Sequence, residues 1–200
     1  MIWSVPELWS GKTVYLLGGG PSLREVDVDR LYGERVIAIN NSYKIAPWAD
    51  ILYFMDCRWW HQHKQAIKTF SGLAVTTCQD CIDVPGIKYL KRGHRRRHDG
   101  RPEYLFRGSN SGAGATSLAI KLGAKRIILF GFDMKVVRGE HNWHDDHERE
   151  VSSKIYQDQF INSFKYLSMT APEYGVEIIN ATPGSDLPYF PIVEPKEVYP

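Results

Sequence analysis

Short apolar runs recur along the chain and alternate with longer polar or amphipathic stretches. Each run is five or six residues long, which is the length of an ordinary strand. The runs are Thr13–Leu17, Arg35–Asn40, Ile51–Met55, Leu73–Thr77, Arg126–Phe130 and Val176–Asn180. Several are apolar at consecutive positions rather than at alternate ones, which indicates parallel strands covered by helices on both faces.

Two of the intervening stretches have helical periodicity. Apolar residues at i, i+3, i+4 and i+7 predict a helix over Gly112–Leu122, with Gly123 at its end. A second helix is predicted late in the chain by an apolar face made of Tyr156, Phe160, Phe164 and Leu167. Because strands and helices alternate, we expect an α/β fold with a Rossmann-like, doubly wound and mostly parallel sheet. The length suits a single domain, residues 1–200.

Two segments do not fit the alternation and are expected to be long loops: Lys91–Arg107 and Val136–Glu150. The first is strongly basic and is expected to act as a lid-like insertion. The second is rich in histidine and aspartate. Long loops within a compact domain are usually functional, so both are candidates for substrate contact.

The composition excludes several classes of protein. The chain is 43% hydrophobic and 24% charged with a net charge of +2, which does not mark a general nucleic-acid binder. Because no apolar run reaches about 18 residues, no membrane span is expected. The N-terminus lacks a signal-peptide pattern, so a cytoplasmic protein is expected.

Three consecutive glycines follow the first predicted strand: Gly18, Gly19 and Gly20, with Pro21 and Ser22 after them. One interpretation is a tight strand–helix turn and nothing more. The other is a phosphate site, since glycine lets backbone N–H groups approach a ligand closely at the start of a helix. The loop has neither the G-x-G-x-x-G spacing of a dinucleotide site nor the Lys-Ser/Thr of a P-loop.

Small polar residues also follow the other predicted strands or begin the helix between them. They are Asn40, Asp56, Asn110, Ser111, Gly112, Asp133 and Ser185. Helix capping alone would explain Asn110 or Ser111. Because the carboxyl ends of parallel strands meet at one edge of a sheet, the whole set predicts a ligand site at that edge.

Three longer segments resemble a known superfamily: GGGPSL (18–23), NSGAGATSLAIKLGAKRIILFGFDM (110–134) and INATPGSDLPYFP (179–191). They are similar to segments of the bacterial lipooligosaccharide sialyltransferases and of the 6-hydroxymethylpterin pyrophosphokinase-like proteins. The resemblance extends from Val14 to Pro191, with gaps at the two loops. The chain is most similar to phage-encoded members, which would place it in the host cytoplasm.

The resemblance implies a transferase that passes a glycosyl group from a nucleotide sugar to an acceptor hydroxyl. By matching motifs, the nucleotide would be held by Gly18–Ser22, Asn40 and Asn110–Gly112, with Ser185 near it. The acceptor is not implied; a glycan and a nucleic acid both stay open. The resemblance does not imply an oligomeric state either, and a homo-oligomer stays open.

Two alternatives remain. The pyrophosphokinase-like branch commonly has an aspartate at the position of Asp56, which would favour ATP with Mg²⁺ held by Asp56 and Asp133. The other alternative is a non-catalytic nucleotide-binding, phage-assembly or DNA-associated protein, because a fold does not imply an activity.

The second loop offers the candidate proton acceptor. His141, His144 and His147 are spaced by three, and Asp145 follows His144 directly. Three histidines can hold zinc, and one can act as a general base near neutral pH. By resemblance to the sialyltransferases, His144 or His147 would take the acceptor proton. An exposed polar loop without a function is the competing interpretation.

The basic loop and a neighbouring aromatic pair complete the candidates. Arg95, Arg96 and Arg97 could bind phosphate bidentately, as a lid over a pyrophosphate or on a nucleic-acid backbone. Trp59 and Trp60 could form a wall of the acceptor site, with core packing as the alternative.

The three cysteines, Cys57, Cys78 and Cys81, are expected to be reduced, since their number is odd and no secretion signal precedes them. Cys78 and Cys81 form a single C-x-x-C pair, which is a weak metal signal. Buried structural thiols are therefore expected, and zinc is not.

Overall fold

Seven parallel strands form the central sheet in the computed structural model of the chain, which describes residues 1–93, 103–106, 108–144, 154 and 156–200. The strand order is β5-β4-β3-β2-β1-β8-β9, and every pairing is parallel. The strands are β1 (Thr13–Leu17), β2 (Arg35–Ile39), β3 (Ile51–Phe54), β4 (Leu73–Thr76), β5 (Ile87–Tyr89), β8 (Arg126–Phe130) and β9 (Glu177–Asn180). The predicted α/β, Rossmann-like sheet is confirmed.

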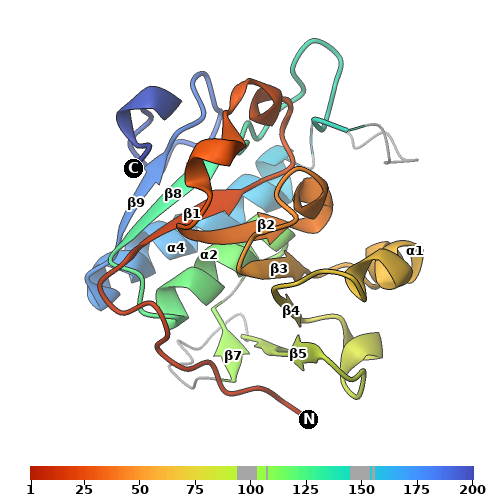
Figure 1. The fold of residues 1–200 in the computed structure, drawn as a ribbon. Helices are drawn as coiled ribbons and strands as arrows, with labels where there is room; N and C mark the ends of the chain where they lie inside the picture. Colours follow the sequence, from red (N-terminus) through yellow and green to blue (C-terminus); the bar gives the residue numbers. More distant parts are fainter. Residues whose placement is uncertain (94–102, 107, 145–153, 155) are drawn as a thin grey trace.

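The two faces of the sheet are covered by different elements (Figure 1). Helices α2 (Ser111–Lys121) and α4 (Asn162–Thr170) pack on one face, where Leu16, Ile39 and Leu129 are buried. A π-helical turn, η5 (Tyr156–Ile161), leads into α4. The opposite face is covered by α1 (Cys57–Ile67) and by the short 3₁₀ turns η1 (Pro21–Glu25), η2 (Val28–Leu31) and η3 (Asn40–Lys44). Since both faces are covered, the strands are apolar at consecutive positions, as predicted.

Helix α2 lies unusually close to the sheet because its buried side is made of small residues. All eight residues from Ala113 to Ile120 are buried. A Cβ atom added to Gly114 would lie 2.2 Å from the hydroxyl oxygen of Tyr53 on β3. The glycine therefore serves contact between helix and strand, and it fixes the position of the helix N-terminus at the sheet edge.

The remaining elements are short. They are η4 (Gln79–Cys81), β6 (Lys91–Arg92), β7 (Tyr104–Leu105), η6 (Ala171–Tyr174) and η7 (Pro195–Glu197). Strands β6 and β7 pair with each other in parallel, so the described ends of the predicted loop 91–107 are extended backbone. The sequence patterns did not predict α1 or β5–β7, because these elements are mainly polar or only two or three residues long.

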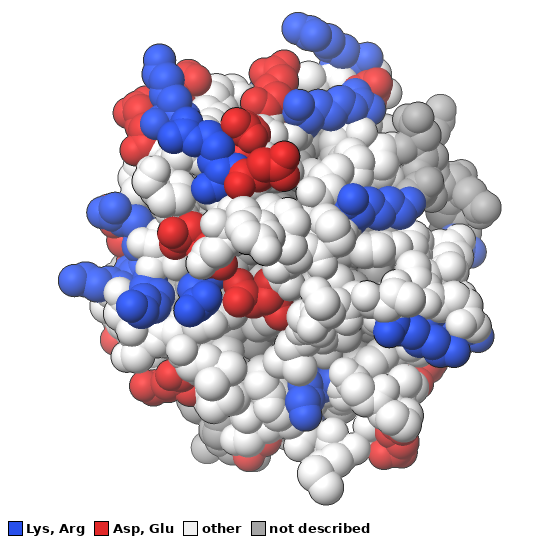
Figure 2. All heavy atoms as spheres, in the orientation of Figure 1, with Lys and Arg blue, Asp and Glu red and all other residues white. Residues whose placement is uncertain are grey.

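Charged groups of both signs are mixed on the surface. On the face shown in Figure 2, described Lys and Arg side chains are interspersed with Asp and Glu side chains. This distribution agrees with the small net charge of the whole sequence. Within the described residues, no helix has the length and apolar character needed to cross a membrane.

Candidate functional site

The strand order reverses between β1 and β8, and this reversal positions the candidate site. From β1 the chain proceeds through β2 to β5 on one side, and it then returns to β8 on the other side of β1. The connection after β1 covers one face of the sheet, whereas α4, after β8, covers the other. A crevice outside the carboxyl ends of two such strands is the usual ligand site of an open α/β sheet. At that position in this fold, here named the crevice, lie the two hydrogen-bonded loops Gly18–Ser22 and Gly131–Asp133.

Two of the three glycines are required by packing between these two loops. The Gly18 N–H donates to the Phe130 carbonyl oxygen, and the Gly20 N–H donates to that of Gly131, both at 2.8 Å. A Cβ atom on Gly18 would lie 2.5 Å from the Gly131 oxygen, and one on Gly20 would lie 1.9 Å from Asp133 Oδ2. None of the three has a positive φ. Two of the N–H groups that were predicted to bind a phosphate thus donate to backbone carbonyl oxygens of the protein instead.

Gly19 differs from its neighbours. A Cβ atom there would meet only Asn142 Oδ1, at 3.2 Å. Its carbonyl oxygen accepts a hydrogen bond from the Trp143 N–H at 3.0 Å, which brings the second predicted loop onto the glycines. Gly19 is therefore the glycine that packing requires least, and it is the best candidate for contact with a ligand.

Asp133 and Ser22 join the two loops by side-chain hydrogen bonds. Ser22 Oγ donates to Asp133 Oδ2 at 2.8 Å, and the Ser22 N–H reaches Oδ1 at 3.4 Å. Burial raises the pKa of the Asp133 carboxyl above its ordinary value, while these hydrogen bonds from Ser22 oppose the shift. Ser185 Oγ donates to the Phe132 carbonyl oxygen and fixes the loop from the other side. All three residues were predicted to bind the nucleotide, and in the structure they join the loops that border the crevice.

Asn40 has two unusual features at the end of β2. Its φ is 50°, in the left-handed region that residues other than glycine rarely occupy. Its side-chain oxygen Oδ1 is buried without a hydrogen-bond partner among the described residues. Each feature destabilises the folded protein. Strained residues and unpaired polar groups are common at ligand sites, where a bound molecule can donate the missing hydrogen bond. Asn40 was predicted to hold the nucleotide.

The next residue, Asn41, links the core to the histidine-rich loop. The indole Nε1–H of Trp59 donates to Asn41 Oδ1. Because an indole nitrogen can only donate, this bond fixes the amide orientation and directs Nδ2 towards Nδ1 of His144, at 3.3 Å. The amide donates, so Nδ1 of His144 accepts, and the proton of the neutral imidazole lies on Nε2. This tautomer donates a hydrogen bond from Nε2, and the role of His144 as the base stays a prediction.

Trp59 and Trp60 lie in the core. They are 5% and 8% exposed and pack on Phe54 of β3. This placement corrects the expectation of an aromatic wall facing the acceptor, because packing against Phe54 and the surrounding core buries both rings. Trp59 is linked to the crevice by its hydrogen bond to Asn41.

Other residues, which the sequence motifs did not indicate, form hydrogen bonds between the loops around the crevice. Ser42 Oγ donates to the Gly18 carbonyl oxygen at 2.6 Å and accepts from Trp143 Nε1 at 3.3 Å. Arg24 Nε donates to the Trp143 carbonyl oxygen at 2.8 Å, and its guanidinium pairs with Glu140. The sequence Asn40-Asn41-Ser42 after a buried strand was the available signal for part of this network.

Of the candidates on the second loop, His141 and His144 lie within the described residues. His141 Nδ1 lies 3.4 Å from the hydroxyl of Tyr156, whose ring stacks on the imidazole. His147 and Asp145 lie outside the described residues. The same holds for Arg95, Arg96 and Arg97 of the basic loop.

The residues at the start of α2 have structural roles. Asn110 caps the helix by accepting a hydrogen bond from the Ala113 N–H at 2.9 Å, and its Nδ2 donates to the Phe160 carbonyl oxygen. Ser111 is the first residue of the helix. A Cβ atom on Gly112 would lie 2.9 Å from the Phe132 ring. This segment therefore docks α2 against the end of β8, next to the crevice.

Asp56 caps α1, where its Oδ1 accepts from the Arg58 N–H at 2.8 Å, and it is exposed. It does not fall into a group of three ligand residues with Asp133. The one such group within the described residues is Cys57, Cys78 and Asp80.

A disulfide joins Cys57 to Cys78, with 5.2 Å between their Cα atoms. This bond corrects the expectation of three reduced cysteines: the residues are distant in sequence, but the adjacent ends of β3 and β4 bring them together. Cys81 is free and buried. Burial raises the pKa of its thiol to about 12.

A cavity of about 630 Å³ opens on the same edge of the sheet, at the ends of β3, β4 and β5. Its lining includes Cys57, Thr77, Asp80, Lys91, Arg92 and Tyr104. Arg92 is held there by hydrogen bonds to Thr77 Oγ1 and to the Met55 carbonyl oxygen. The cavity thus has a fixed cationic side chain.

Comparison with known proteins shows the fold of the chain. No protein-family model and no curated protein sequence matches it. Its structure is similar to the sialyltransferase CstII from Campylobacter jejuni in complex with cytidine-5'-monophosphate, with a TM-score of 0.59, 16% identity, and coverage of 93% of this chain and 86% of that chain. It is also similar to the CstII complex with CMP-3FNeuAc, with a TM-score of 0.54, 16% identity, and coverage of 91% and 86%. The chain therefore has a sialyltransferase-like α/β fold.

Proposed function

We propose that this protein is a nucleotide-sugar-dependent glycosyltransferase that binds its donor in the crevice between the ends of β1 and β8. The observation that carries the proposal is Asn40, whose buried Oδ1 lacks a partner among the described residues at a strained backbone position beside that crevice. A nucleotide offers N–H and O–H groups that an amide oxygen can accept. The fold is shared with CstII, which was solved with CMP and with CMP-3FNeuAc, and this likeness supports a nucleotide or nucleotide sugar as the ligand.

The reaction needs three things from the chain. The acceptor oxygen forms a bond to the anomeric carbon, the bond from that carbon to the phosphate oxygen breaks, and the electron pair leaves with the nucleotide. The hydroxyl proton passes to a base. Donors directed at the departing phosphate stabilise the transition state, as elsewhere in group-transfer enzymes.

His144 suits the leaving group. The contact of Nδ1 with the Asn41 amide favours the tautomer that donates from Nε2, so we assign His144 to the departing phosphate. The acceptor proton then needs another base, and His147 and Asp145 remain the predictions for that role. Arg95–Arg97 remain predictions for phosphate contact.

A magnesium-dependent transfer from ATP is the less favoured alternative. It would use Asp56 and Asp133, but Asp133 accepts from Ser22 at both oxygens and Asp56 caps α1. These carboxylates would have to exchange their present hydrogen bonds for a metal. The resemblance to phage-encoded proteins, and with it a role in phage assembly, stays a prediction.

Ligand binding is the first test. We expect CMP to raise the unfolding temperature of the purified protein in a panel with UDP, GDP and ATP, each with and without Mg²⁺. Asn40→Ala should weaken binding, whereas Asn162→Ala, at an exposed asparagine on α4, should not. If no nucleotide stabilises the chain, the proposal fails and the non-catalytic alternative is favoured.

Catalysis is tested by nucleotide release. We expect the protein to liberate CMP from a CMP-sugar, slowly with water and faster with an added sugar acceptor, and to do so in the presence of a chelator. Activity that needs ATP and is abolished by the chelator would favour the magnesium-dependent alternative.

A further inference from the structure

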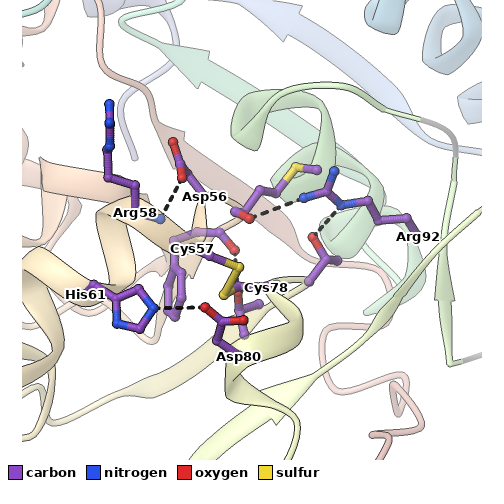
Figure 3. The surroundings of a disulfide bond; sticks show 11 residues. Asp56, Cys57, Arg58, His61, Cys78, Asp80 and Arg92 are labelled. Carbon is purple, nitrogen blue, oxygen red and sulfur yellow. Dashed lines mark hydrogen bonds and ion pairs between the residues drawn. A yellow bond between two sulfur atoms is a disulfide. The ribbon is translucent and has the colours of Figure 1, made fainter. Parts of the chain in front are cut away.

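Two sulfur atoms, a carboxylate and an imidazole gather at the wall of the cavity at the ends of β3 and β4. Cys57 Sγ, Cys78 Sγ and a carboxylate oxygen of Asp80 all lie within 4.8 Å of one another. His61 Nε2 lies 2.8 Å from Asp80 Oδ2. Figure 3 shows His61 pointing at Asp80 and Asp80 lying beside the sulfur pair.

Two separate elements supply these groups at suitable spacings. Cys57 and His61 are four residues apart on α1, so they share one face of that helix. Cys78 and Asp80 come from the turn after β4, and strand β4 is hydrogen-bonded to β3. The sheet therefore brings the four side chains together whether or not the sulfur atoms are bonded.

We propose that Cys57, Cys78 and Asp80 form a zinc site when the Cys57–Cys78 bond is reduced. The disulfide takes up two electrons and two protons from a thiol reductant, which is itself oxidised to a disulfide. Zn²⁺ then displaces the two thiol protons and binds both sulfur atoms. Thiolate ligands favour Zn²⁺ over harder cations, and at zinc–ligand distances of about 2.0–2.3 Å three atoms this close can share one ion.

His61 orients the carboxylate of this site. Its ring bonds to Oδ2 of Asp80, which leaves the other carboxylate oxygen for the metal. Hydrogen bonds of this kind from outside the ligand sphere fix ligand geometry, and their loss typically weakens metal binding by about 10–100-fold.

The fourth zinc position opens into the cavity. Cys57 and Asp80 line it, and so do Lys91 and Arg92, which carry positive charge. Three protein ligands with one open position are typical of zinc sites that bind water or a substrate atom. An anionic oxygen would fit this position best, because the two basic side chains lie in the same cavity.

The test compares metal content in two redox states. We expect protein reduced with a non-thiol phosphine to retain about one zinc per chain after desalting, and air-oxidised protein to retain none. Cobalt(II) in place of zinc should give a sulfur-to-cobalt charge-transfer band. Both signals should be lost in Cys57→Ser and Cys78→Ser, and His61→Gln should weaken binding by about 10–100-fold.

Matched controls come from the same turn. Cys81→Ser removes a neighbouring thiol, and Asp83→Asn an exposed carboxylate that pairs with the N-terminus; neither should change metal content. The comparison of reduced with oxidised wild-type protein needs no variant, so it holds even if a cysteine substitution impairs folding. The proposal is overturned if reduced protein retains no zinc, or if Cys57→Ser/Cys78→Ser retains as much as wild type.

Discussion

At Gly20 there is no room for a side chain, whereas Gly19 has room for one. A methyl group on Gly20 would overlap the Asp133 carboxylate and approach the Gly131 oxygen at 2.8 Å. We expect Gly20→Ala to lower the free energy of unfolding by about 2 kcal/mol or more, and Gly19→Ala by less than about 1 kcal/mol. Urea unfolding of the two variants measures the difference. Equal stabilities would mean that the loops are not packed as described.

Gly19→Ala also separates the two interpretations of the glycine run. If the glycines form only a turn, a folded Gly19→Ala protein should bind nucleotide as the wild type does. If backbone approaches the ligand at Gly19, its binding should weaken while its stability is kept.

Trp59 sets the tautomer of His144 through Asn41. In Trp59→Phe the amide of Asn41 loses its fixed orientation, and buried Oδ1 loses a donor at a cost of about 1–2 kcal/mol. We expect the ¹⁵N chemical shifts of the His144 ring to move from a pure Nε2–H pattern towards a mixture. Trp60→Phe, in the same aromatic cluster, is the control. Unchanged His144 shifts in Trp59→Phe would contradict the link.

Asp133 should make stability depend on pH. Its pKa is raised in the folded protein, so folding favours the protonated carboxyl. The resulting stabilisation is fully present below the ordinary carboxyl pKa, about 3.9, and is lost as the pH rises through the raised value. Asp133→Asn should remove this component. The free energies of unfolding of both proteins, measured in urea between about pH 3.5 and 7, should diverge over that range. Parallel pH dependences would contradict a contribution from Asp133.

At the scale of elements, the N-terminus of α2 combines a structural role with a predicted functional one. Aspartate keeps the oxygen that caps α2 but loses the Nδ2–H that donates to the Phe160 carbonyl oxygen, so Asn110→Asp should lower the free energy of unfolding by about 1–2 kcal/mol. It adds negative charge where the nucleotide phosphate is predicted to lie. We therefore expect weaker CMP binding by a protein that is still folded; calorimetry measures the binding and urea unfolding measures the stability. Undiminished CMP binding would confine Asn110 to capping.

Helix α1 shows why some elements escaped sequence patterns. Of its eleven residues only Trp59, Trp60 and Ile67 are buried and most of the others are polar, so α1 lacks the dense apolar pattern by which the other helices were predicted. The six predicted strands and the α2 and α4 helices have dense apolar patterns, and all were found. Their limits were right to within a few residues, because burial on a sheet demands a continuous apolar segment.

At the scale of the whole molecule, the disulfide ties α1 to the end of β4 across 21 residues. A closed loop of this size restricts the unfolded chain, so we expect reduction to lower the free energy of unfolding by about 3 kcal/mol when a chelator removes zinc. Urea unfolding with and without a phosphine measures it. The Cys57→Ser/Cys78→Ser protein should be insensitive to the reductant; a similar response there would assign the effect elsewhere.

The sequence by itself determined the parallel α/β sheet and the edge where its polar strand ends meet. Apolar runs and helical periods are local properties of the sequence, so they can be recognised without knowing which distant residues are in contact. The positions of Asn40 and of Gly18–Ser22 at that edge could therefore be predicted, since each directly follows a strand, whereas ligand binding there stays a prediction.

Only the tertiary structure decided what most of these residues contact. The roles of Gly20 against Asp133, of Trp59 on Asn41 and of Cys57 with Cys78 depend on atoms from separate elements. Trp59 was expected at the acceptor, and the cysteines were expected to be reduced. Both expectations were wrong for one physical reason: packing against β3 and pairing of β3 with β4 bring together side chains that no sequence spacing relates.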